Sequence, residues 1–174
     1  MKKRILSLSI IFTCFSSFAQ SINIPINIIT DEGVGKNIGV VNIAESPYGL
    51  LFTPDLKELS PGMHGFHIHE NASCAPGLMD GKKVAGLSAG GHFDPEKTGK
   101  HLGPYNADGH LGDLPPVYVN NDGTATAPVL APRLKSIKDI SQHAIMIHKG
   151  GDNHSDSPLP SGGGGGRIAC GIIN

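Results

Sequence analysis

The chain has 174 residues, enough for one domain with a substantial apolar core. It carries 14 Lys+Arg against 15 Asp+Glu, a formal net charge of −1, and this balance excludes the strongly basic surface typical of nucleic-acid-binding proteins. Against this ordinary charge, the nine histidines are a high count for the length, and 24 glycines and 13 prolines recur throughout.

Residues 1–19 predict a secretory signal peptide. The basic start "KKR" is followed by an apolar run and then by "SFA", which resembles a cleavage site ending at Ala19. The apolar run is too short for a membrane span. Cleavage after Ala19 would leave residues 20–174 as the mature domain, with no membrane span. It would also reduce Lys+Arg from 14 to 11 against 15 Asp+Glu, and so move the net charge from −1 to −4.

Residues 20–174 predict an all-β domain. Helical periodicity is hard to find, and short runs rich in Val, Ile and Thr are separated by Gly and Pro. These runs predict strands at 22–30, 36–46, 49–56, 62–70, 113–120, 123–131, 143–149 and 167–173. Eight short strands separated by turn residues favour an antiparallel sandwich or barrel. Two long segments, 71–112 and 150–166, interrupt this pattern, and such loops in a compact domain are usually functional or disordered.

Two features of the C-terminal third bear on the second long loop. Residues 162–166 are five consecutive glycines, which by composition alone would be a flexible linker. The strand-like "RIACGII" follows at once, so we expect a bend that a neighbouring site requires.

The segment "RIACGII" also contains Cys170, which remains with Cys74 after signal cleavage, and two cysteines in an exported protein usually pair.

The stretch "GFHIHENASC" places two imidazoles on one face of a predicted strand. Successive side chains of a strand point to opposite faces, so His67 and His69 lie opposite the apolar pair Phe66 and Ile68. Two neutral imidazoles side by side form a chelating pair for zinc, copper or iron. The alternative is an exposed polar strand face that happens to contain two histidines.

The long loop supplies a second candidate site in "GGHFDPEKTGKHLGPYNADGHLGD". His92, His101, His110 and Asp113 offer three imidazoles and a carboxylate, which satisfies the four-coordinate preference of zinc. The segment has too few apolar residues to fold by burial alone, and a metal ion would order it because binding energy becomes folding energy. Solvated loop histidines are the alternative.

In "HAIMIHKGGD" the strand alternation separates two further histidines. His143 falls on the apolar face and predicts a structural role, whereas His148 falls on the other face and could join His67 and His69. Three strand imidazoles with one more from the loop would form an all-nitrogen site, which suits copper.

Two histidines stay outside both candidate sites. His64 has the core-side parity of its strand, so we leave it out of the site. His154 lies in the second loop, where parity gives no assignment, and its role stays open.

Five ordered motifs resemble the copper,zinc superoxide dismutases, in particular the exported bacterial branch: "GFHIHE", "AGGHFDP", "KHLGPYNADGHLGDL", "HAIMIHKGGDNHSD" and "GGGGGRIACGII". The resemblance covers essentially the whole mature chain. It implies an eight-stranded antiparallel Greek-key β-barrel in the periplasm, as a monomer or a homodimer. The implied reaction converts two superoxide anions to dioxygen and hydrogen peroxide by redox cycling of copper, with a structural zinc.

The resemblance also implies roles for individual residues. Copper would be held by His67, His69, His92 and His148, and zinc by His92, His101, His110 and Asp113, with His92 bridging the two ions. Asp152 would hydrogen-bond one copper histidine and one zinc histidine, Cys74 and Cys170 would form the family's disulfide, and Arg167 would stand beside the copper. Arg167 and His92 are therefore the predicted catalytic residues.

Rival interpretations concern function more than fold. A non-catalytic periplasmic copper- or zinc-binding protein on the same fold would need the ligands but not Arg167, so the enzyme is favoured. A cell-surface interaction domain with incidental histidines is a weaker alternative. For the enzyme, an anionic substrate meeting a chain of net charge −4 needs a locally positive approach, and Lys82 or Lys83 is the candidate to supply it.

Overall fold

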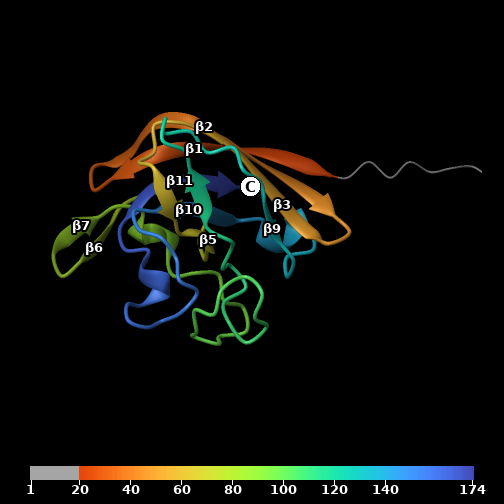
Figure 1. Ribbon diagram of the computed structural model, residues 1–174. Helices are drawn as coiled ribbons and strands as arrows, with labels where there is room; N and C mark the ends of the chain where they lie inside the picture. Colours follow the sequence, from red (N-terminus) through yellow and green to blue (C-terminus); the bar gives the residue numbers. More distant parts are fainter. Residues whose placement is uncertain (1–19) are drawn as a thin grey trace, which may run out of the picture.

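The computed structural model describes residues 20–174, and Figure 1 shows their arrangement. The predicted signal peptide, 1–19, lies outside the described residues. Within 20–174, no helix is long and apolar enough to cross a membrane.

The described chain is almost entirely built of β-strands, which confirms the predicted all-β class. The strands are β1 (Ser21–Thr30), β2 (Gly33–Ser46), β3 (Gly49–Leu56), β4 (Gly62–His64), β5 (Phe66–His69), β6 (Gly77–Met79), β7 (Lys82–Val84), β8 (Val117–Val119), β9 (Val129–Ala131), β10 (His143–His148) and β11 (Arg167–Ile173). Three short 3-10 helices complete the structure: η1 (Leu87–Ala89), η2 (Ile137–Ile140) and η3 (Ser161–Gly163).

Seven strands form one antiparallel sheet in the order β5-β10-β11-β1-β2-β3-β9. The sheet curls, so that its two ends approach one another around the core (Figure 1). Strands β4 and β8 form a separate pair, and β6 and β7 form a hairpin inside the first long loop. The two long loops lie together below the sheet in Figure 1, and the first of them carries the candidate ligands His92, His101 and His110.

Each of the eight predicted segments contains a strand, but four of them differ in extent by more than one residue. Strand β2 begins three residues before the predicted segment 36–46. The segment 62–70 divides at Gly65 into β4 and β5, which belong to different sheets. The division has a local cause, because the Gly65 N–H donates to the Gly150 carbonyl and its own carbonyl accepts from His148 N–H. Segments 113–120 and 123–131 shorten to β8 and β9, and the β6–β7 hairpin was not predicted.

Alternation along β5 and β10 gives each strand two different faces. Phe66 and Ile68 belong to the main apolar core, where the ring of Phe66 packs edge-on against Phe52 with centroids 5.8 Å apart. His67 and His69 lie on the opposite face, as the alternation predicts. Both are fully buried rather than exposed, because loop segments cover that face.

A disulfide joins Cys74 of the first long loop to Cys170 of β11, which confirms the predicted pairing. The two residues are separated by 96 positions, and closing a loop of that length constrains the unfolded chain by about 4–5 kcal/mol. The bond ties the first loop to the strand that begins with Arg167. A small buried cluster, which includes both cysteines, Ala89 and Met146, fills the space around it.

Candidate metal centre

The free edge of β5 positions the ligands of the first loop. Ile68 forms two backbone hydrogen bonds with the loop: its N–H donates to the Gly112 carbonyl, and its carbonyl accepts from Phe93 N–H, each at 2.8 Å. This pairing places His92 opposite His69, and Asp113 opposite His67. The candidate ligands of the loop are thus aligned by the same ladder geometry that aligns those of the strand.

The first group of candidate ligands consists of four imidazoles whose donor nitrogens lie within 4.8 Å of one another: His67, His69, His92 and His148. Each of the three strand histidines donates its other ring N–H to an oxygen: His67 Nε2 to Asp152 Oδ2 at 2.8 Å, His69 Nδ1 to the Gly90 carbonyl at 3.0 Å, and His148 Nδ1 to the Gly165 carbonyl at 3.1 Å. Such acceptors fix the tautomer and leave the inward nitrogen free for a metal ion.

The protonation states of this group suit a metal site. Burial lowers the pKa of His67, His69 and His92, and it lowers the pKa of His148 to about 4. All four rings are therefore neutral near pH 7, the state in which imidazole binds a metal ion. The Nδ1 atom of His67 is buried without any hydrogen-bond partner, which a cation in this position would satisfy.

The second group combines three imidazoles with one carboxylate: His92, His101, His110 and Asp113. The Nδ1 atoms of the three histidines lie 2.9, 3.0 and 3.3 Å from the Asp113 oxygens. At His101 and His110 these contacts lack hydrogen-bond geometry, and both Nδ1 atoms are buried without a partner. Two ligand nitrogens that converge on the Asp113 carboxylate without bonding it fit a cation between them.

The charges around the second group favour a bound cation as well. Burial opposes ionisation of Asp113, but contacts with His101, His110 and His92 hold the pKa of its carboxyl well below the ordinary range. Burial also opposes protonation of His101, yet the carboxylates of Asp113 and Asp152 raise its pKa to about 9. The group therefore presents a buried negative charge whose counter-charge is supplied by a proton or by a metal ion.

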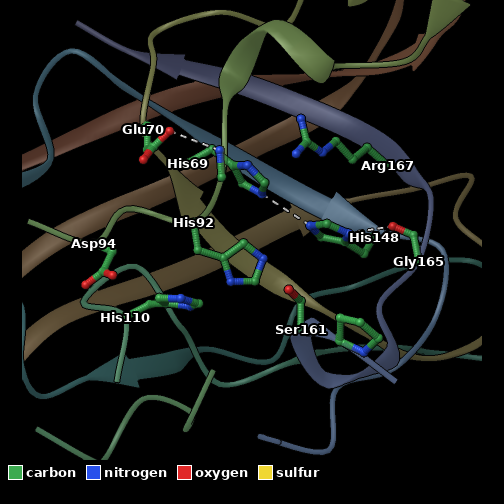
Figure 2. Close-up of a pocket in the computed structure, with 11 residues that line it drawn as sticks. His69, Glu70, His92, Asp94, His110, His148, Ser161, Gly165 and Arg167 are labelled. Atoms are coloured by element: carbon green, nitrogen blue, oxygen red, sulfur yellow. Dashed lines mark hydrogen bonds between the residues drawn. The ribbon is translucent and has the colours of Figure 1, made fainter. Parts of the chain in front are cut away.

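His92 belongs to both groups. Its Nδ1 atom faces Asp113 of the second group at 2.9 Å, so that Nε2 faces the first group. Its ring lies 3.9 Å from that of His67 and 5.3 Å from that of His110, measured between centroids. Figure 2 shows His92 between His69 and His148 on one side and His110 on the other.

Asp152 forms hydrogen bonds with one histidine of each group. One carboxylate oxygen accepts from His67 Nε2 and the other from His101 Nε2, each at 2.8 Å. Gly162 lies against this carboxylate: a Cβ atom added there would stand 2.0 Å from Asp152 Oδ1, and the backbone has φ = +71°. The glycine run therefore contains a bend that packs on a ligand-supporting residue, as we expected from the sequence.

A cavity of about 460 Å³ opens above both groups. Imidazoles of both groups line it together with Glu70, Asp94 and Arg167 (Figure 2). The Arg167 guanidinium is half-buried and donates from Nη1 to the Gly86 carbonyl and from Nη2 to the Gly90 carbonyl. Two backbone carbonyls thus hold the positively charged guanidinium of Arg167 at the wall of the cavity.

Sequence reasoning missed the two carboxylates of the cavity. Glu70 directly follows His69, and Asp94 comes two residues after His92, so proximity to the ligands in the sequence was the available signal. Lys82 and Lys83 do not line the cavity; both are exposed on the β6–β7 hairpin. Sequence reasoning also could not find the Gly86 and Gly90 carbonyls, since backbone acceptors have no residue signature.

The other three histidines lie outside both groups. His64 is buried, and its Nδ1 lies 2.7 Å from the His148 carbonyl, so it supports the backbone of a candidate ligand. His143 donates from Nδ1 to the Glu70 carbonyl at 2.7 Å, in agreement with a structural role. His154 packs its ring on Gly103 within the loop region.

The fold and the site together define a class of protein: a β-barrel metalloprotein whose two adjoining donor sets share one imidazole. A model of the family "Copper/zinc superoxide dismutase" matches residues 37–173. The chain is 58% identical to superoxide dismutase [Cu-Zn] 1 of Salmonella typhimurium, over 99% of both chains. Among solved structures, it matches the Cu/Zn superoxide dismutase of Brucella abortus (TM-score 0.87, 51% identity, 89% of this chain and 100% of that chain) and the monomeric enzyme of Salmonella enterica (TM-score 0.81, 58% identity, with the same two coverages).

The chain therefore belongs to the copper/zinc superoxide dismutase family. Its reaction is the conversion of superoxide to dioxygen and hydrogen peroxide, and its cofactors are copper and zinc. The non-catalytic alternative is not favoured, because relatives of such high identity over the full length carry the name of the enzyme.

Proposed function

We propose that the first group binds the catalytic copper and the second group binds the zinc. The proposed copper ligands are His67, His69, His92 and His148, and the proposed zinc ligands are His92, His101, His110 and Asp113. An all-nitrogen set suits copper, whereas three imidazoles and a carboxylate match the tetrahedral preference of zinc. The observation that carries this assignment is the sharing of His92 between the two donor sets.

His92 is proposed to transfer a proton as well as to serve as a candidate ligand in both groups. Copper held by the first group would supply electron transfer through its two oxidation states. The Nδ1 atom of His92 is held on the Asp113 side, which fixes the ring and leaves Nε2 directed toward the first group. We assign Nε2 as the atom that takes up a proton and passes it to the departing peroxide.

Arg167 is proposed to bind the superoxide anion. A guanidinium has five N–H donors, and the two carbonyls of Gly86 and Gly90 use one on each terminal nitrogen. The remaining donors are available to a small anion in the cavity. The carbonyl contacts also fix the orientation of the group, so little side-chain entropy is lost when substrate binds.

The protein is proposed to act in the periplasm after cleavage near Ala19. The support is the composition of residues 1–19, a basic start and an apolar run before a small-residue cleavage site. The intact mass of the protein from a cell-envelope fraction tests this proposal: the mature chain should begin near Gln20.

A monomer is the proposed oligomeric state, supported by the monomeric Salmonella enterica relative, with a homodimer as the alternative.

The metal assignment is tested by replacing a residue that belongs to one group alone. His101→Ala should lower zinc content and leave most copper in place, whereas His69→Ala should do the reverse. Metal analysis of the folded variants, paired with a superoxide-removal assay, measures both effects. Equal loss of both metals from each folded variant would contradict two separable sites.

A further inference from the structure

Arg133 holds the backbone of the loop that presents His110. It lies between β9 and η2, far from the candidate ligands in the sequence, and its side chain is half-buried. Its Nη1 donates to the His110 carbonyl at 2.9 Å, and its Nη2 donates to the Gly109 carbonyl at 2.9 Å and to the Ala107 carbonyl at 3.3 Å. One guanidinium therefore binds three carbonyls within four consecutive residues.

Arg133 has no acidic partner among the ion pairs of residues 20–174. A half-buried cation without a carboxylate is stabilised mainly by the carbonyl dipoles around it. Hydrogen bonds from a charged donor are stronger than those between neutral groups. The contacts of Arg133 are thus directed entirely to this loop.

His110 is the least supported ligand of the second group. Its side chain is 14% exposed, whereas the side chains of His101 and Asp113 are fully buried. The His101 ring is fixed by Asp152, but no hydrogen bond from the His110 ring to such an acceptor is present in the described chain. The position of His110 therefore depends on its backbone.

That backbone has few other anchors. His110 N–H donates to the Lys100 carbonyl at 2.9 Å, within the same loop. The turn before it is closed by a long contact of 3.5 Å between Gly109 N–H and the Asn106 carbonyl. Arg133 supplies the connection from this turn to the strand framework, 23 residues away.

We propose that Arg133 is a positioning residue that keeps His110 in place for zinc, and so sets how long the enzyme retains that ion. This inference rests on the proposed zinc assignment. It predicts that loss of Arg133 acts through His110 and leaves the copper group largely unchanged, because no contact of Arg133 reaches His67, His69 or His148.

The experiment measures zinc release from the loaded enzyme to an excess of chelator. Arg133→Met removes all three hydrogen bonds while keeping an apolar stem, and should speed zinc release at least about tenfold, since even one charge-assisted bond is worth this much. Arg133→Lys should restore part of the retention. Lys135→Ala is the matched control: Lys135 is exposed on the same loop and donates only to the Pro132 carbonyl, so its loss should leave zinc release unchanged.

A double-mutant comparison separates positioning from a general structural role. His110→Ala should release zinc quickly, and adding Arg133→Met to it should change the rate little, because the ligand that Arg133 positions is already gone. Cobalt substituted for zinc gives a second readout: the visible spectrum of Arg133→Met should shift toward that of His110→Ala. If Arg133→Met speeds release equally with and without His110, the residue acts on the fold at large and the proposal is wrong.

The outcomes also distinguish this inference from the zinc assignment. Normal zinc retention in both Arg133→Met and Arg133→Lys, together with rapid release from His110→Ala, would overturn the role of Arg133 alone. Normal retention in His110→Ala would overturn the zinc assignment and the inference together. Should Arg133→Met fail to fold, Arg133→Gln retains amide donors, and the same comparison with His110→Ala applies to it.

Discussion

Replacement of Gly162 by Ala should disrupt the support of both metal groups at once. The backbone at Gly162 has φ = +71°, a left-handed conformation that costs an alanine about 1–2 kcal/mol. The new Cβ would also stand 2.0 Å from Asp152 Oδ1 and 2.9 Å from His101 Nε2, between the two partners of a hydrogen bond. Asp152 must therefore move, and the loss of one hydrogen bond to a charged group costs about 1.5–3 kcal/mol more.

The two costs sum to about 2.5–5 kcal/mol of unfolding free energy, if they are independent. For a domain of this size each kcal/mol lowers Tm by about 2–4 °C, so we expect a decrease of about 5–20 °C. The assay is thermal unfolding of the metal-loaded enzyme, followed by circular dichroism, with metal analysis of the same samples. Zinc and copper should both be lost more readily, because Asp152 contacts His101 and His67.

Gly166 provides the control within the same glycine run. A Cβ at Gly166 meets nothing within 4 Å, and its φ lies outside the left-handed region. Gly166→Ala should therefore unfold near the wild-type temperature and keep both metals. If Gly162→Ala and Gly166→Ala behaved alike, the argument that the glycine run is shaped by Asp152 would be refuted.

Three further predictions concern the charges that meet the substrate. Arg167→Ile should keep both metals and lower the superoxide-removal rate about tenfold or more, because one or two charge-assisted hydrogen bonds of about 1.5–3 kcal/mol each are lost. Arg167→Lys should recover part of the rate, and full activity of the Ile variant at low salt would exclude the proposed role. Glu70→Gln should raise the low-salt rate about twofold, because a cavity carboxylate at on the order of 10 Å repels an anion by about 0.4 kcal/mol in water, and the gain should vanish in high salt. Replacing both Lys82 and Lys83 with Glu should slow the reaction at low salt; an unchanged rate and salt dependence would remove the hairpin from substrate steering.

The strands that the sequence predicted well are those with sustained alternation. The segments 22–30, 49–56, 143–149 and 167–173 match β1, β3, β10 and β11 within one residue at each end. The separation of β4 from β5 was not predictable, because a glycine within an apolar alternating run gives no sign that the chain changes sheets. The β6–β7 hairpin did have a local signal, the turn dipeptide Asp80-Gly81, but the segments on either side of it are too short and too polar to form an apolar run.

The site shows a similar division between local and long-range information. Parity along a strand placed His67 and His69 on one face and His148 on the corresponding face of β10, which is a local property of each segment. Parity could not show that His92 of the long loop lies close to these residues. In the structure, backbone pairing between the loop and β5 brings His92 next to them, and such pairing has no residue-specific signal in the sequence.

The pairing of loop segments with β5 has a consequence for association between chains. β5 is the terminal strand of the seven-stranded sheet, and an open strand edge is a template for pairing with another protein molecule. Here the N–H and carbonyl of Ile68 are both occupied by residues of the first long loop. The segment that carries the candidate zinc ligands therefore also covers a sheet edge. Conditions that disorder this loop should expose β5 and promote aggregation, even while the rest of the sheet stays folded.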